Sequence, residues 1–130
     1  MAKKRGLLFV LPWPPSINHY YGPRKGGGVR LLPAGRQYRW RVREYLAGKK
    51  FEPFDKDDRL CVQLFVHPPD RRKRDLDNIQ KAILDALQRG GVYPDDCQID
   101  LLFVARSALK DSTGEINVQI STIGGPDGED

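Results

Sequence analysis

The chain has 130 residues, of which 39% are hydrophobic and 30% charged, and its formal net charge is +5; this length suits one soluble globular domain. No apolar run approaches the roughly 20 residues of a membrane-spanning helix, and Leu7–Leu11 is too short for the apolar core of a secretion signal. We therefore expect one cytoplasmic domain over residues 1–130, with frayed ends at about residues 1–6 and 124–130.

The positive charge is concentrated in the first part of the chain. Residues 1–50 contain 12 Lys and Arg and one acid, Glu44, whereas residues 51–130 contain 10 Lys and Arg and 16 Asp and Glu. A basic surface attracts polyanions such as nucleic acids, although a solvated basic face without a partner has the same composition. We favour a nucleic acid as the partner of the basic part.

The first half of the chain is predicted to form a strand, a long loop and a helix. Leu7–Leu11 is typical of a buried strand, which the prolines after it end. The stretch from Ser16 to Pro33 contains three successive glycines and is predicted to be a loop, with at most a short hairpin. Ala34–Gly48 has the spacing of an amphipathic helix, with Trp40 off its apolar stripe. Its many cations suit a DNA-facing surface and a solvated surface equally.

The second half is predicted to contain three strands and one helix. Arg59–His67 alternates between apolar and other residues, which indicates a strand with one buried face. Leu76–Gln88 has the strongest helical spacing and ends before two glycines. Ile99–Ala105 and Glu115–Ile123 are the remaining strands. This order predicts an α+β fold, a small mixed β-sheet with two helices packed on it.

The segment from Asp70 to Asp85 combines cations and acids at the start of the second predicted helix. Four consecutive cations, Arg71–Arg74, run directly into Asp75 and Asp77. Cations of this density bind DNA phosphates, and clustered carboxylates bind hard divalent metals. The combination indicates metal-dependent cleavage of phosphodiester bonds.

A purely structural role explains some of the same residues. Asp75 is a favoured helix N-cap, and Asp77 in the first turn interacts favourably with the helix dipole. This role leaves the number of cations unexplained. Lys81 follows Asp77 by four residues, which suits either an ordinary ion pair or a cation that stabilises a charged transition state; the spacing favours neither.

A further acidic pair, Asp95-Asp96, follows Pro94. A turn takes such acids readily, but Asp96 is also a candidate third carboxylate. The predicted helix is about 20 Å long, and the chain from Gly90 to Asp96 spans a similar distance when extended. Asp96 therefore either returns to the start of the helix or completes a site in a dimer, and the sequence leaves both possibilities open.

The cationic and acidic block, Asp70–Ala82 followed by Asp95-Asp96, resembles the RusA family of Holliday junction resolvases. The start of the chain agrees as well, at Pro12–Ser16, Asn18 and Tyr20-Tyr21. The similarity extends from about Leu7 to Ile123 in the same order. The glycine-rich insert Lys25–Val29 departs from the family's pattern, so the preferred cleavage sequence is not implied.

The resemblance implies a RusA-like homodimer that makes paired symmetric nicks in four-way DNA junctions with Mg²⁺ or Mn²⁺. Asp75, Asp77 and Asp96 correspond to the family's catalytic, metal-binding carboxylates, and Lys81 corresponds to its catalytic lysine. No role is carried over for Asp95. The residues expected to contact DNA are Arg71, Arg72, Lys73, Arg74, Asn18, Tyr20 and Tyr21.

Two other functions fit the sequence. The first is a non-catalytic nucleic-acid-binding module, in which exposed bases stack on aromatic side chains; the candidates are Trp13, Tyr20, Tyr21 and Trp40. Packing in the core and the loops is the alternative role of these aromatic residues. The second function is a nuclease that prefers other branched DNA, such as flaps or forks.

Overall fold

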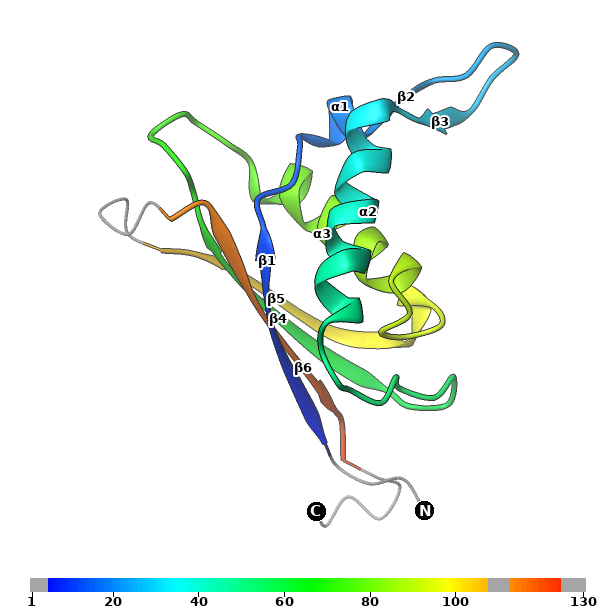
Figure 1. Cartoon of the computed structure of the whole chain (residues 1–130), viewed down its shortest axis with the longest axis vertical. Coiled ribbons are helices and arrows are strands. Elements are labelled where there is room, and N and C mark those ends of the chain that lie inside the picture. The colour runs from blue at the N-terminus through cyan, green and yellow to red at the C-terminus, as the bar shows by residue number, and fades with distance from the viewer. Residues whose placement is uncertain (1–4, 108–112, 125–130) are drawn as a thin grey trace.

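Four strands with alternating apolar residues form a mixed sheet in the computed structural model, which describes residues 5–107 and 113–124 (Figure 1). The strands are β1 (Gly6–Pro12), β4 (Leu60–His67), β5 (Ile99–Arg106) and β6 (Glu115–Thr122), in the order β1-β6-β4-β5. Strand β6 is antiparallel to both of its neighbours, whereas β4 and β5 are parallel. The predicted small mixed sheet and α+β fold are confirmed.

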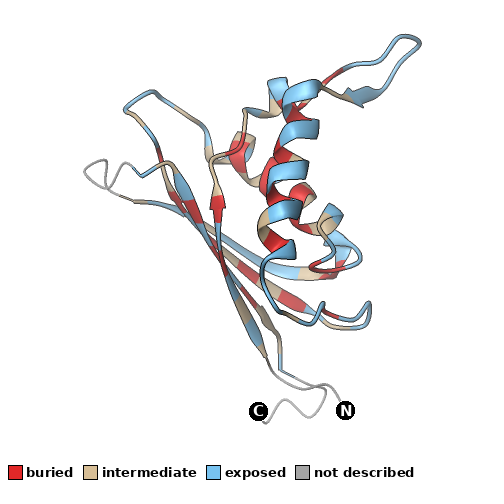
Figure 2. Cartoon of the chain, viewed as in Figure 1, coloured by how far each residue is buried: buried red, intermediate tan, exposed pale blue. Residues whose placement is uncertain are grey.

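Two long helices, α2 (Pro33–Ala47) and α3 (Leu76–Arg89), lie over one face of this sheet. The alternate residues of β4 that face them are fully buried, as the red segments in Figure 2 indicate. Helix α2 turns Tyr38, Val42 and Leu46 inward and leaves Trp40 exposed, as its apolar stripe predicts. The core therefore lies between the two helices and the sheet.

The expected loop after β1 contains more structure than the sequence indicates. A single helical turn, α1 (Ile17–Tyr20), leads into a small hairpin of β2 (Tyr21–Pro23) and β3 (Val29–Leu31). The turn packs closely on α2, because a Cβ atom at Gly35 would lie only 2.5 Å from the backbone oxygen of Tyr20. Glycine at this helical position therefore permits the close approach of α1.

The N-terminal end of β1 is held, although residues 5 and 6 were expected to fray. Gly6 pairs with Ser121 in the sheet, and the Arg5 side chain donates to the carbonyl oxygens of Glu52 and Pro53. The other residues expected to fray, 1–4 and 125–130, lie outside the described residues. Within the described ranges, no helix is both long and apolar enough to cross a membrane.

The connection from β4 to β5 determines where the candidate site residues lie. Because the two strands are parallel, α3 returns the chain from the end of β4 to the short 3-10 helix η1 (Asp96–Gln98), which precedes β5. Asp75 precedes α3 and Asp96 follows it, and the 14 residues of α3 span about 21 Å. Asp75 therefore lies at the N-terminal end of α3, whereas Asp96 lies on the segment that follows the C-terminal end of this helix.

Candidate active site

A pocket lies at the N-terminal end of α3 and contains one of the predicted catalytic carboxylates. Its volume is about 320 Å³. Asp75 and Asn78 line it from the start of α3, and Lys73 and Arg74 line it from the cationic segment. The segment after β1 supplies the opposite wall, which consists of Trp13, Pro14 and Ser16. The pocket therefore combines a carboxylate, an amide and two cations at one helix end.

Asp75 occupies the N-cap position of α3 without using its carboxylate as a cap. Its backbone is extended, and its carbonyl oxygen accepts a hydrogen bond of 3.2 Å from the backbone N–H of Asn78. Its side chain makes no capping hydrogen bond and is exposed. The capping role considered for the Asp75 side chain is therefore not seen, and the carboxylate is available to a ligand.

Asp77 and Lys81 lie on the exposed surface of the first turns of α3. Among the described residues, the ion pairs of the structure do not include one between these two side chains. The ordinary ion-pair role weighed for Lys81 is therefore not seen. Its ammonium group and the carboxylate of Asp77 both remain open to solvent.

Two of the four consecutive cations are engaged within the protein. Arg74 lies 2.8 Å and Arg72 lies 3.1 Å from the carboxylate oxygens of Asp70, and the Arg74 guanidinium also lies over the Trp13 ring at 5.3 Å from its centroid. The hydrogen bonds from Arg74, and then those from Arg72, hold the pKa of Asp70 well below its usual range. Arg72 and Arg74 thus help to shape the segment.

The other two cations, Arg71 and Lys73, form no ion pair with the described acidic side chains. Both are exposed, and Lys73 lines the pocket beside Asp75. The prediction that all four cations contact DNA therefore applies differently to two pairs of residues. Arg71 and Lys73 have free charge to offer a phosphate, whereas Arg72 and Arg74 share the single negative charge of the Asp70 carboxylate.

Asp95 and Asp96 lie beyond the other end of α3. The Asp95 carboxylate caps η1 by accepting a hydrogen bond of 2.9 Å from the backbone N–H of Cys97, which lowers its pKa. Asp96 is exposed. In the described part of the chain, no three His, Cys, Asp or Glu side chains are grouped so that they could hold a metal. Within one subunit, the structure does not bring Asp96 to Asp75.

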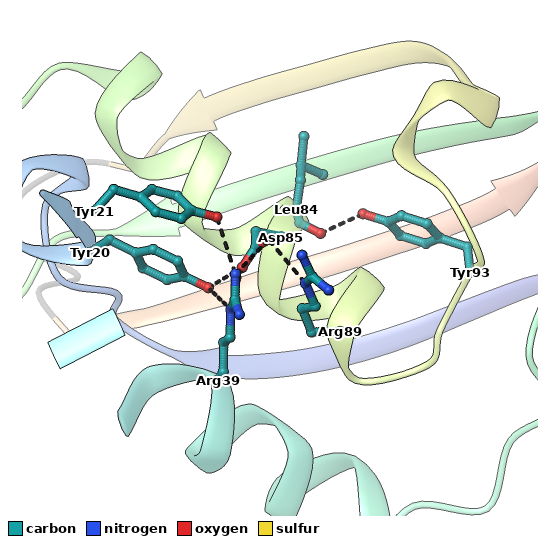
Figure 3. A network of polar contacts seen from close by, with 7 residues as sticks. All are labelled: Tyr20, Tyr21, Arg39, Leu84, Asp85, Arg89 and Tyr93. Atoms are coloured by element: carbon teal, nitrogen blue, oxygen red, sulfur yellow. Dashed lines mark hydrogen bonds and ion pairs between the residues drawn. The ribbon is translucent and has the colours of Figure 1, made fainter. Parts of the chain in front are cut away.

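A second polar cluster, which the sequence did not reveal, joins the helices (Figure 3). Asp85 on α3 accepts hydrogen bonds from Arg39 on α2 and from the hydroxyl of Tyr20 on α1. Arg39 also donates to the hydroxyl of Tyr21 at 3.3 Å. Burial opposes ionisation of Asp85, but the hydrogen bonds from Tyr20 and Arg39 outweigh it and lower the pKa of Asp85. This cluster ties the segment after β1 to α3.

The cluster changes the assignment of one predicted DNA contact. Tyr20 is fully buried, and burial together with its hydrogen bond to Asp85 raises the pKa of its hydroxyl. Its ring is therefore part of the core and is not accessible to DNA in this structure. Asn18 is exposed on α1, and Tyr21 is half-buried. In the sequence, the one indication of this cluster was Asp85, because it is an acidic residue next to Ala86 of the apolar stripe of a predicted amphipathic helix.

Comparison with known proteins identifies the family. A family model described as Endodeoxyribonuclease RusA matches residues 12–121. A crossover junction endodeoxyribonuclease rusA from Enterobacteria phage HK97 is 37% identical over 115 residues, which cover 88% of this chain and 93% of that protein. Proteins of the same name from Enterobacteria phage 82 and Escherichia coli strain K12 are 39% and 38% identical over 90 residues, which cover 69% of this chain and 73% of each. The chain therefore belongs to the RusA family of endodeoxyribonucleases.

Proposed function

We propose that this chain is a metal-dependent endodeoxyribonuclease that resolves four-way DNA junctions by paired symmetric nicks. Its relatives at 37% and 39% identity are named crossover junction endodeoxyribonucleases. The observation that carries the proposal is the pocket at the start of α3. The Asp75 carboxylate, which makes no capping hydrogen bond, lines this pocket together with Lys73. Because the substrate is DNA, we place the protein in the cytoplasm.

The carboxylates at this helix end suit a hard divalent cation. Asp75 and Asp77 supply oxygen ligands, which Mg²⁺ and Mn²⁺ prefer. Mg²⁺ is commonly held by one or two carboxylates together with phosphate oxygens of the substrate, so two protein ligands suffice to begin a site. When bound by Asp75 and Asp77, the ion would lower the pKa of a water molecule and stabilise negative charge on the phosphate.

The cations around the pocket suit the phosphates of the DNA. Arg71 and Lys73, whose charges are uncompensated by described acidic side chains, would hold phosphates that flank the cleaved bond and so position the DNA without reading its bases. Lys81, exposed on α3 and free of Asp77, would stabilise the additional negative charge of the transition state. Asn18 and Tyr21 would contact DNA beside the pocket wall.

We further propose that the chain acts as a homodimer formed through the sheet face opposite the helices. This face carries large apolar side chains that are exposed in the single chain, at 74% for Leu8, 53% for Phe103 and 42% for Phe65. Leu101 and Phe103 pair in register with β4 residues that face away from the helices. A second copy suits this face, because two symmetric nicks require two equivalent sites related by a two-fold axis.

A dimer also offers a role for Asp96. Among the described residues of one subunit, Asp96 is not grouped with Asp75 and Asp77 so that the three could hold a metal, whereas it is exposed and open to contact from a second copy. We propose that Asp96 completes the carboxylate set of the other subunit's site. Asp95 takes no part in this set, since its carboxylate caps η1.

The proposed function is tested by incubating the purified full chain with a synthetic mobile four-way junction. We expect paired nicks at symmetric positions in the presence of Mg²⁺ or Mn²⁺, and none when the metal is removed by EDTA. Preferred cutting of flaps or forks would assign the chemistry to other branched DNA. Binding without any metal-dependent nick, as tight to single strands as to junctions, would indicate a non-catalytic binding module instead.

A further inference from the structure

The outward face of α2 carries an exposed aromatic side chain between two cations. Arg36, Trp40 and Arg43 follow one another at intervals of four and three residues, so they share one stripe of the helix. The Trp40 side chain is 58% exposed, and both arginines are exposed. Neither arginine forms an ion pair with an acidic side chain in the described ranges. These three side chains therefore belong neither to the core nor to the Asp85 cluster.

Three adjoining hollows connect this stripe to the pocket at Asp75. The pocket shares Trp13 and Pro14 with a second hollow of about 260 Å³, which also includes Gln37 and Arg41 of α2. The second hollow shares Gln37 with a third of about 430 Å³, which Arg36 and Trp40 line. The three hollows therefore follow one another along the surface between Asp75 and Trp40.

The charges along this path are predominantly positive. Lys73 lies at the pocket, Arg41 at the second hollow and Arg36 at the third. Glu44 is the one acidic residue of α2. A path with these charges suits the phosphates of one DNA strand, and the exposed indole suits the face of an unpaired base. Paired bases present only their edges in the grooves, so the indole favours single-stranded over duplex DNA.

We propose that this path binds the single DNA strand that extends from the active site and that an unpaired base of this strand stacks on Trp40. We call the path the Trp40 track, and it consists of Lys73, Trp13, Gln37, Arg41, Arg36 and Trp40. The inference rests on the proposed function at one end only, where the track begins at the pocket of Asp75. It adds a binding site for unpaired nucleotides on the outward face of α2, apart from the pocket of Asp75.

The track is tested by the binding of a dye-labelled oligothymidine of about 12 nucleotides to the full chain, without metal, by fluorescence anisotropy. Trp40→Ala should weaken binding by at least about fivefold, the lower end of the effect of losing one stacked base. Trp40→Phe keeps an aromatic ring and should retain most of the affinity. Arg36→Ala should weaken binding and reduce its salt dependence, whereas Lys56→Ala, a matched loss of charge before β4, should not.

Each outcome decides the inference. The track is contradicted if wild-type protein does not bind the oligothymidine, if Trp40→Ala binds as tightly as wild type, or if Lys56→Ala is as harmful as Arg36→Ala. Because this assay contains no metal and no junction, it also separates the two proposals. Trp40-dependent binding by a protein that never nicks junctions would support the track and reject the proposed function, and nicking without Trp40-dependent binding would do the reverse.

Discussion

Arg39 on α2 and Asp85 on α3 form a two-pronged ion pair that joins the two long helices. The Nε atom of Arg39 lies 2.7 Å from Oδ2 of Asp85, and its Nη2 atom lies 3.2 Å from Oδ1. The two side chains are only 18% and 16% exposed. The pair thus holds α2, with the Trp40 stripe, at a defined position relative to the helix that begins at Asp75.

Loss of this pair should destabilise the fold. Asp85→Asn leaves the guanidinium of Arg39 largely buried without its counter-ion, and we expect the free energy of unfolding to fall by roughly 2 kcal/mol. Urea denaturation measures the difference. Arg89→Ala is the matched control, because Arg89 lies 3.7 Å from the same carboxylate but is 57% exposed, and we expect a loss below about 0.5 kcal/mol. Equal effects of the two substitutions would contradict this role of the pair.

The contribution of Asp85 should depend on pH in one direction. Its pKa is lowered in the folded state, so its ionised form stabilises the fold above the pKa of an unfolded aspartate, about 3.9. This stabilisation is lost as the pH falls through the lower folded pKa. The stability gap between wild type and Asp85→Asn should therefore be constant between about pH 5 and 8 and shrink below about pH 4. A stability difference between the two proteins that grows as the pH falls would contradict a lowered pKa of Asp85.

The division of the four cations predicts an unequal contribution to DNA binding. Lys73 lines the pocket and its charge is uncompensated by described acids, so Lys73→Ala should weaken junction binding and reduce the slope of log affinity against log salt by about 0.9. Binding titrations at several salt concentrations give this slope. Lys56→Ala removes the same charge from the turn before β4 and should leave the slope unchanged. A slope that does not respond to Lys73→Ala would remove this lysine from the interface.

A contribution of Asp96 across the dimer can be detected by mixing subunits. Asp75→Asn and Asp96→Asn homodimers should each be inactive if both carboxylates serve the same site. In a mixed dimer, one site would receive Asp75 from one subunit and Asp96 from the other, so nicking of one DNA strand should return. If Asp96 served the site of its own subunit, both sites of the mixed dimer would stay incomplete. Recovery of nicks on refolding the two variants together is the measurement.

Periodicity predicted the parts of the fold that depend on local alternation. The buried face of β4 and the limits of α3 agree with the sequence to within one residue, because one side of each element packs on the core. The hairpin β2–β3 was expected at most as a possibility, since three-residue strands have too few residues to show a period. Side-chain pairing, such as Arg39 with Asp85, joins residues 46 apart and leaves no local pattern.

The position of Asp96 shows what a length argument left open. The segment after α3 is long enough to return to the start of the helix when extended, but it does not extend. Val92 and Tyr93 are buried, and the Tyr93 hydroxyl donates to the carbonyl oxygen of Leu84 at 2.8 Å. This burial and this hydrogen bond hold the segment against the C-terminal half of α3, so that it does not extend back toward Asp75. The burial of Val92 and Tyr93 therefore decided where the segment lies, although its extended length would allow it to return to the start of α3.

The most direct test of the account is the nicking of a four-way junction by Asp75→Asn. Asparagine keeps the shape of the side chain but removes the charged metal ligand, so we expect the rate of nicking with Mg²⁺ to fall by at least about a hundredfold while the affinity for the junction persists. Asp57→Asn, in the exposed turn before β4, should nick at the wild-type rate. Nicking by Asp75→Asn at the wild-type rate would contradict the assignment of the pocket at α3 as the active site.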